Sequence, residues 1–167
     1  MADIFVSYKT EERDLAKRVV ARLQKAGYFV WYDPKLTPDK PWNKLIEDEL
    51  RAAKAVLVLW TPLSVKSESV TEEALWAKQA EKLISVKMKP CELPYGFGRH
   101  QTADLTKWNF SPDDPEWRKV LNSIEIIIII KPDRNKVAGE HPSEKDNDFA
   151  DRAGLANLNR SISGSPA

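Results

Sequence analysis

Residues 55–60 read Ala55-Val56-Leu57-Val58-Leu59-Trp60, a run of six apolar residues with no polar interruption. A strand with one face in water alternates apolar and polar side chains, whereas a strand covered on both faces is apolar throughout. The run is therefore typical of a central strand in a parallel sheet. Other short apolar runs flank it along the chain, and they predict strands at residues 4–6, 28–32, 83–88 and, more weakly, 103–106.

Segments with helical periodicity separate these strands. Between the first two, Leu15, Val19, Leu23 and Ala26 recur at helical spacing and Gly27 supplies the stop. Similar patterns predict helices over residues 42–53, 67–82 and 114–130. The last one ends in five isoleucines, which fit either a buried strand or a helix held by packing, because β-branched residues are poor helix formers. We predict the helix.

This alternation predicts an α/β fold, a flavodoxin-like, doubly wound five-stranded parallel sheet. Such sheets bind ligands at the carboxyl ends of their strands, near the switch in strand order, which points to the loops at residues 7–12, 33–41 and 61–69. These loops contain no dinucleotide fingerprint, no P-loop and no acidic pair of the response-regulator type, and the chain has no Gly-x-Ser-x-Gly elbow. The sequence thus excludes the commonest enzymes of this architecture.

Composition excludes further classes. The 167 residues include 26 basic and 25 acidic side chains, a balance that predicts no nucleic-acid or membrane partner. One cysteine and two histidines make an internal disulfide impossible and a zinc site improbable, so we expect no metal. The longest purely apolar run, residues 55–60, and the isoleucine run at residues 126–130 are both far shorter than the ~20 residues of a membrane helix. We expect a cytoplasmic protein.

The aromatic residues indicate where the domain ends. Of the 15 aromatic residues only Phe149 lies beyond Lys131, and residues 133–167 are rich in Asp, Glu, Asn, Ser and Gly. A segment with so few bulky apolar side chains cannot bury enough surface to order itself. We therefore predict one domain over residues 1–131 and a flexible C-terminal tail or linker over residues 132–167.

Four segments together resemble the Toll/interleukin-1 receptor (TIR) domain, especially its bacterial members. They are Asp3-Ile4-Phe5-Val6-Ser7-Tyr8, residues 27–33, residues 36–42, and residues 53–67 followed by Val70-x-x-Glu73-Ala74. The family comprises interaction modules and enzymes that split NAD at the nicotinamide–ribose bond. The resemblance therefore implies a TIR fold and either of these two functions.

The resemblance puts the family's catalytic glutamate at Glu73. The local sequence agrees, because Ser69-Val70-Thr71-Glu72 has the form of a capping box that occupies Glu72 and leaves Glu73 free. Helical spacing sets Glu73 beside Val70 and alanines, where burial would raise its pKa. A glutamate that merely complements the helix dipole is the structural alternative.

Other site residues follow from the resemblance. Tyr8, Lys9 and Trp42 would surround the substrate, with Lys9 near the pyrophosphate, although Trp42 also begins an apolar helix stripe and packing in the core is an alternative role for it. The BB loop, named for the second strand it follows, would mediate assembly through Asp33, Leu36, Pro38 and Asp39.

The function that we expect is NAD glycohydrolase, with NAD as substrate and no cofactor. It would release nicotinamide and ADP-ribose or a cyclic ADP-ribose. Self-association with other TIR domains would activate it, in bacterial immunity or signalling. A fused or associated recognition module would be a further partner. The alternative is a non-catalytic module for TIR–TIR signalling or host mimicry. Ser69, where many members have tryptophan, favours this alternative, whereas Glu73 and Lys9 favour the enzyme.

Overall fold

The computed structural model describes residues 1–32 and 44–130. Strands and helices alternate along this part of the chain, with two short 3-10 helices, η1 and η2, after the first and third strands. The elements are β1 (Ile4–Ser7), η1 (Thr10–Glu12), α1 (Arg13–Lys25), β2 (Val30–Trp31), α2 (Lys44–Ala52), β3 (Ala55–Trp60), η2 (Ser64–Lys66), α3 (Glu68–Gln79), β4 (Leu83–Lys87), β5 (Thr102–Asp104) and α4 (Pro115–Ile130). The predicted tail, residues 132–167, lies outside the described residues, so the domain boundary stays a prediction.

The strands form one parallel sheet in the order β2-β1-β3-β4-β5. This order is that of the flavodoxin-like sheet and confirms the predicted architecture. From β1 the chain goes to the edge strand β2 on one side and then returns past β1 to β3 on the other side, so the strand order reverses between β1 and β3. These two strands pair from Ile4 opposite Ala55 to Ser7 opposite Val58. The switch point therefore lies at the carboxyl ends of these two strands.

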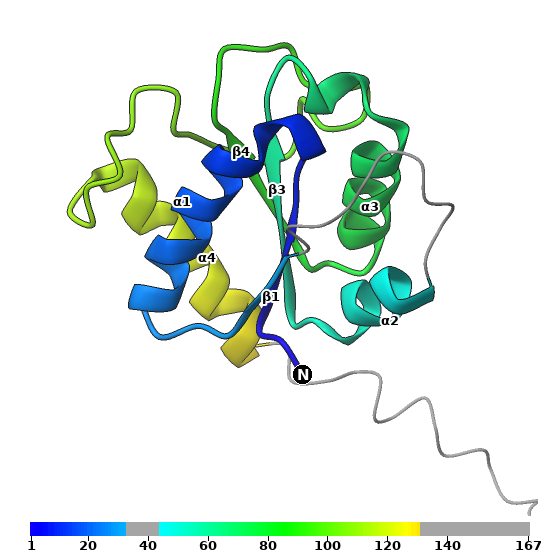
Figure 1. Ribbon diagram of the computed structural model, residues 1–167, viewed down its shortest axis with the longest axis horizontal. Helices are drawn as coiled ribbons and strands as arrows, with labels where there is room; N and C mark the ends of the chain where they lie inside the picture. The colour runs from blue at the N-terminus through cyan, green and yellow to red at the C-terminus, as the bar shows by residue number, and fades with distance from the viewer. Residues whose placement is uncertain (33–43, 131–167) are drawn as a thin grey trace, which may run out of the picture. The chain divides into compact units, whose positions relative to one another are not determined.

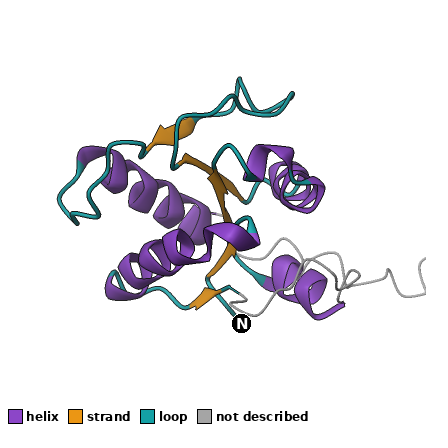
Figure 2. Ribbon diagram, turned by 45° about the horizontal axis from the view of Figure 1, so that its top comes forward, coloured by secondary structure: helices purple, strands orange, loops and turns teal. Residues whose placement is uncertain are grey.

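Helices cover both faces of the sheet, with α1 and α4 on one side and α2 and α3 on the other (Figure 1; Figure 2 shows the layers with the top of the molecule tilted toward the viewer). Because side chains alternate along a strand, Leu57 and Leu59 pack with α1 and α4, whereas Val56, Val58 and Trp60 pack with α2 and α3. Every residue of β3 is buried as a result. The apolar run thus forms the central strand, as predicted.

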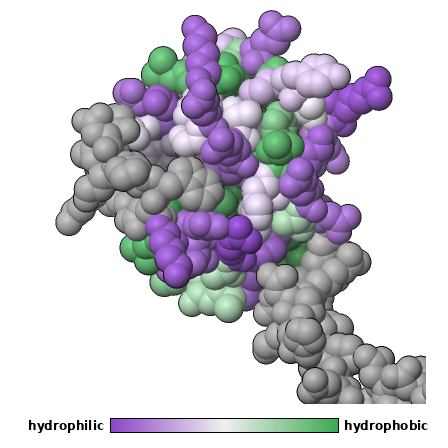
Figure 3. Space-filling model, turned by 90° about the vertical axis from the view of Figure 1, so that its right-hand side faces the viewer, coloured by the Kyte–Doolittle hydropathy of each residue, from purple (hydrophilic) through white to green (hydrophobic). Residues whose placement is uncertain are grey.

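The outer surface on the side of α2 and α3 is mainly hydrophilic, with scattered apolar residues (Figure 3). Leu45 of α2 and Leu75 of α3 are among the exposed apolar side chains of the described chain. The two helices are therefore amphipathic, and their apolar sides face the sheet. Within residues 1–32 and 44–130, no helix combines the length and the apolar character needed to cross a membrane.

The five isoleucines continue helix α4, as predicted. Ile124 is fully buried in the cluster under α1 and α4, and Ile127 and Ile128 pack against the same cluster, while Ile126 and Ile129 are 52% and 71% exposed. This alternation has helical rather than strand periodicity. Packing on one side therefore outweighs the low helix propensity of isoleucine.

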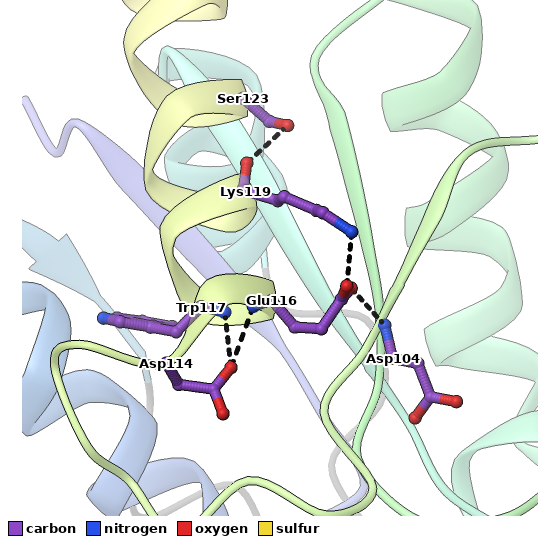
Figure 4. Close-up of polar contacts among 6 residues, drawn as sticks. All are labelled: Asp104, Asp114, Glu116, Trp117, Lys119 and Ser123. Atoms are coloured by element: carbon purple, nitrogen blue, oxygen red, sulfur yellow. Dashed lines mark hydrogen bonds and ion pairs between the residues drawn. The ribbon is translucent and has the colours of Figure 1, made fainter.

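The start of α4 is fixed by polar contacts (Figure 4). Asp114 caps the helix, because its Oδ1 accepts hydrogen bonds from the backbone N–H groups of Glu116 and Trp117 at 2.8 and 3.1 Å. The Glu116 carboxylate in turn accepts a 3.4 Å hydrogen bond from the backbone N–H of Asp104 and contacts Lys119. These contacts tie the last helix to the edge strand β5.

Two strands differ from their predicted ranges by more than one residue at an end, β2 (predicted 28–32) and β5 (predicted 103–106). β2 does not begin at Tyr28, because the Tyr28 N–H bonds to Leu23 O and closes the end of α1, a turn in which Gly27 has a φ of 94°. β5 ends at Asp104 instead of residue 106, because the Asp104 carboxylate accepts hydrogen bonds from the N–H and hydroxyl of Thr106. In both places a local turn removes the backbone from the sheet.

Candidate functional site

Ser7 and Glu73 meet at the switch point of the sheet. Ser7 is the last residue of β1 and is 1% exposed, and Glu73 lies in the second turn of α3, which covers that face of β1. The Ser7 hydroxyl donates a 2.5 Å hydrogen bond to Oε2 of Glu73. The strand and the helix therefore place a carboxyl group where parallel sheets of this order bind their ligands.

The start of α3 sets the position of Glu73 along the helix. The N-cap is Ser67, whose hydroxyl accepts a 3.5 Å hydrogen bond from the Val70 N–H. The prediction of Ser69 as N-cap, with Glu72 closing a capping box, is wrong. Ser67 has extended backbone angles and its carbonyl already accepts from the Thr71 N–H at 3.0 Å, so Ser69 falls inside the first turn.

A buried turn leads from the central strand into this helix. Thr61 directly follows β3, and its backbone N–H donates to the Ser64 hydroxyl at 2.8 Å, while the Ser64 N–H donates to the Thr61 hydroxyl at 3.1 Å. Both residues are buried. Reciprocal bonds of this kind satisfy the backbone groups that the turn removes from water. The turn fixes where α3 begins relative to β3.

The surroundings of Glu73 change its acidity. Val70, Ala74 and Ala77 on the same side of the helix are buried. This burial raises the pKa of Glu73 from 4.5 to about 7, against the hydrogen bond from Ser7, which lowers it, and together with the nearby Glu72 charge, which raises it. The raised pKa agrees with the expectation from helical spacing. Near pH 7 the carboxyl group is thus divided between its neutral and ionised forms.

Of the other predicted site residues, Tyr8 and Lys9 are among the described residues. Tyr8 packs against the apolar cluster under α1 and α4, on the opposite face of the sheet from α3. Lys9 directly precedes η1, and its ammonium group lies 3.7 Å from a carboxylate oxygen of Glu11 in a partly exposed ion pair. Trp42 lies outside the described residues, as do Asp33, Leu36, Pro38 and Asp39 of the predicted BB loop. The roles of all these residues stay predictions.

Sequence reasoning missed three residues at this edge of the sheet. Ser7 supports Glu73 directly, and Glu12 forms a 2.8 Å ion pair with Lys89, which follows β4. The partners are 66 and 77 residues apart along the chain. A period-2 count from Phe5 places Ser7 on one face of the sheet, but only the fold shows which helix covers that face.

Comparisons with known proteins agree with this architecture. The TIR domain of the Toll-related receptor TRR-2 from Hydra magnipapillata superimposes with a TM-score of 0.63 at 20% identity, over 75% of this chain and 99% of that one. A metazoan TIR-STING receptor from C. gigas, solved in complex with 2',3'-cGAMP, superimposes with a TM-score of 0.58 at 18% identity, over 79% of this chain and 40% of that one. At such identities these likenesses show the fold alone.

Sequence comparison identifies the family independently. The search among curated proteins found no match. The family model described as TIR domain, in contrast, matches residues 4–121, which include β1 with Ser7, the central strand β3 and helix α3 with Glu73. Together with the sheet order and the two structural likenesses, this match shows that the chain belongs to the TIR domain family.

Proposed function

We propose that this TIR domain is an NAD glycohydrolase and that Glu73 is its catalytic carboxylate. The observation that carries the proposal is the half-buried Glu73 carboxyl group, hydrogen-bonded to Ser7 at the switch point, with a pKa of about 7. Carboxyl groups with strongly raised pKa values in such a position are candidates for catalysis. A glutamate that only complements a helix dipole needs neither burial nor a buried hydroxyl partner.

In the proposed reaction, the bond between C1′ of the ribose and the nicotinamide nitrogen breaks, and its electron pair goes to nicotinamide. Water adds to C1′ and loses a proton, which gives ADP-ribose. A nucleophile within the substrate, in place of water, gives a cyclic product. The positive charge that develops on the ribose is stabilised by the ionised Glu73, as carboxylates do in glycoside hydrolysis.

Ser7 and Lys9 have separate roles in this proposal. The Ser7 hydroxyl donates to the Glu73 carboxylate, so it favours the ionised form and fixes the direction of the carboxylate. Lys9 binds the pyrophosphate of NAD. Its ion pair with Glu11 is partly exposed and 3.7 Å long. Ion pairs near the surface contribute little to stability, so Lys9 can exchange Glu11 for a phosphate at a small cost in free energy.

Self-association belongs to the same proposal. TIR domains interact with other TIR domains, and the BB loop of one copy of this chain would complete the site of the next. Tyr8 and Trp42 would then line the substrate, with Asp33, Leu36, Pro38 and Asp39 at the contact. The rate per molecule is therefore expected to rise with protein concentration.

The test follows nicotinamide release from NAD by concentrated protein, alone and under crowding. We expect release that rises faster than linearly with protein concentration and that Glu73→Ala lowers by about 100-fold or more, the scale of removing one electrostatic stabiliser. Glu72→Ala is the matched control, because it removes the neighbouring, exposed carboxylate of the same helix. Its rate should stay within a factor of about three.

Two results would contradict the proposal. If the wild-type protein releases no nicotinamide even when forced to assemble, the enzymatic function is wrong and the interaction module is the better account. Equal release by the Glu73→Ala variant would support the enzymatic function but show that Glu73 is not its catalytic carboxylate.

A further inference from the structure

Glu12 is a buried carboxylate that the proposed reaction does not use. It closes η1, directly after the loop that leaves β1, and only 8% of its surface is exposed. Its Oε2 accepts a 2.8 Å hydrogen bond from the ammonium group of Lys89, which lies after β4. The ion pair therefore connects the loops that follow two different strands, 77 residues apart in sequence.

Each partner is also held by its own backbone. The Glu12 N–H donates to Lys9 O at 2.7 Å, which closes the turn from Lys9 to Glu12. On the other side, the N–H groups of Met88 and Lys89 donate to Trp60 O at 2.9 and 3.5 Å, which fixes Lys89 at the carboxyl end of the central strand. The Glu12–Lys89 pair thus anchors a turn that contains Lys9 to the carboxyl end of the central strand.

Stability alone is a poor explanation for this pair. Desolvation of a buried carboxylate can cancel the attraction of its partner, and apolar residues of similar volume often stabilise a fold as well or better. An ion pair instead imposes a defined distance and direction. The turn that it holds begins two residues after Ser7, the residue that supports Glu73.

We propose that the Glu12–Lys89 ion pair is a positioning element that holds the turn of residues 9–12 so that Lys9 meets the anionic part of the substrate. This inference rests on the proposed function for its substrate, the pyrophosphate of a dinucleotide. Neither Glu12 nor Lys89 contacts the substrate. Both act through Lys9, because the carbonyl of Lys9 and the N–H of Glu12 close the same turn.

The experiment removes both charges together, because loss of Lys89 alone would leave the Glu12 carboxylate buried and unpaired and could unfold the protein. In the E12Q/K89Q double variant we expect the KM for NAD to rise by about tenfold, since a misplacement on the order of 1 Å can cost as much as about 100-fold. The kcat should change by less than about threefold, because Glu73 and Ser7 are untouched. D113N/R118Q is the matched control, because it removes an exposed ion pair at α4.

Non-additivity separates positioning from a merely structural role. If the pair acts through Lys9, then K9A raises the KM by itself, and adding E12Q/K89Q to K9A raises it no further. The charge-reversed variant E12K/K89E should bring the KM back toward the wild-type value. An unchanged KM in E12Q/K89Q, or an increase that adds fully to that of K9A, would overturn the proposal.

Amide hydrogen exchange distinguishes failure of the positioning proposal from failure of the proposed function. In E12Q/K89Q, the backbone amide of position 12 should exchange at least about tenfold faster, with amides in β3 unchanged. If the wild-type protein does not cleave NAD, the proposed function is wrong. Amide hydrogen exchange then tests by itself whether the Glu12–Lys89 ion pair holds the turn of residues 9–12. Faster exchange confined to residues 8–12 supports it, and unchanged exchange overturns it.

Discussion

Glu73 is expected to make the folded protein less stable as the pH rises, and Glu73→Gln should remove this dependence. The carboxyl group has a pKa of 4.5 in an unfolded chain and about 7 in the folded one. Between these values the folded state binds more protons than the unfolded state, so the free energy of unfolding falls as the pH rises. The side-chain amide of glutamine has nearly the same shape, can accept the hydrogen bond of Ser7, and does not ionise.

The two pKa values set the size of the effect. Each pH unit between them corresponds to roughly 1.4 kcal/mol, so ionisation of Glu73 lowers the free energy of unfolding by about 3 kcal/mol once the pH exceeds 7. At pH 5 the same term is only about 1 kcal/mol. We therefore expect Glu73→Gln to be more stable than the wild-type protein by about 3 kcal/mol at pH 8.5, and by much less at pH 5.

The assay is urea denaturation of both proteins at these two pH values. Titration of the other groups cancels in the difference between variant and wild type at one pH. Glu72→Gln, which changes the adjacent exposed residue, serves as control and should differ from wild type by less than about 0.5 kcal/mol at either pH. The reasoning is refuted if the stability difference for Glu73→Gln is the same at pH 5 and pH 8.5. A stabilised variant that also loses NAD cleavage would show that the carboxyl group is retained for function.

Two further predictions concern stability away from the reaction. Ser67→Ala should lower the free energy of unfolding by about 1 kcal/mol, because Ser67 caps α3. Ser69→Ala should change it by less than about 0.5 kcal/mol. Chemical denaturation that shows the larger loss of stability for Ser69→Ala would contradict the cap assignment. Asp3→Ala should destabilise the protein by about 1–2 kcal/mol at pH 7, because the Asp3 carboxylate accepts hydrogen bonds from Lys54 and from the Phe29 N–H. Although burial opposes it, these partners hold the pKa of Asp3 below its usual 3.8, so the stabilisation is present above pH 3.8 and is lost as the pH falls below it; an equal effect at pH 2.5 would refute this.

The sequence contains enough local information to predict the architecture. The unbroken apolar run predicts β3 as a central strand, and helical spacing with Gly27 predicts the end of α1, because these features depend on near neighbours and on covering both faces of the sheet. Local patterns were less decisive at the start of α3, where Ser67 and Ser69 are both acceptable caps. The preceding turn of Thr61 and Ser64 decides between them.

The sequence by itself therefore determined the order of strands and helices, the family, and a glutamate on a small apolar helix face. Only the tertiary structure decided what that glutamate meets. Ser7 and Glu73, like Glu12 and Lys89, come from segments more than 60 residues apart, and no local spacing relates them. They come together because every strand of the sheet is parallel, so the crossovers bring the carboxyl ends of β1, β3 and β4 to one edge.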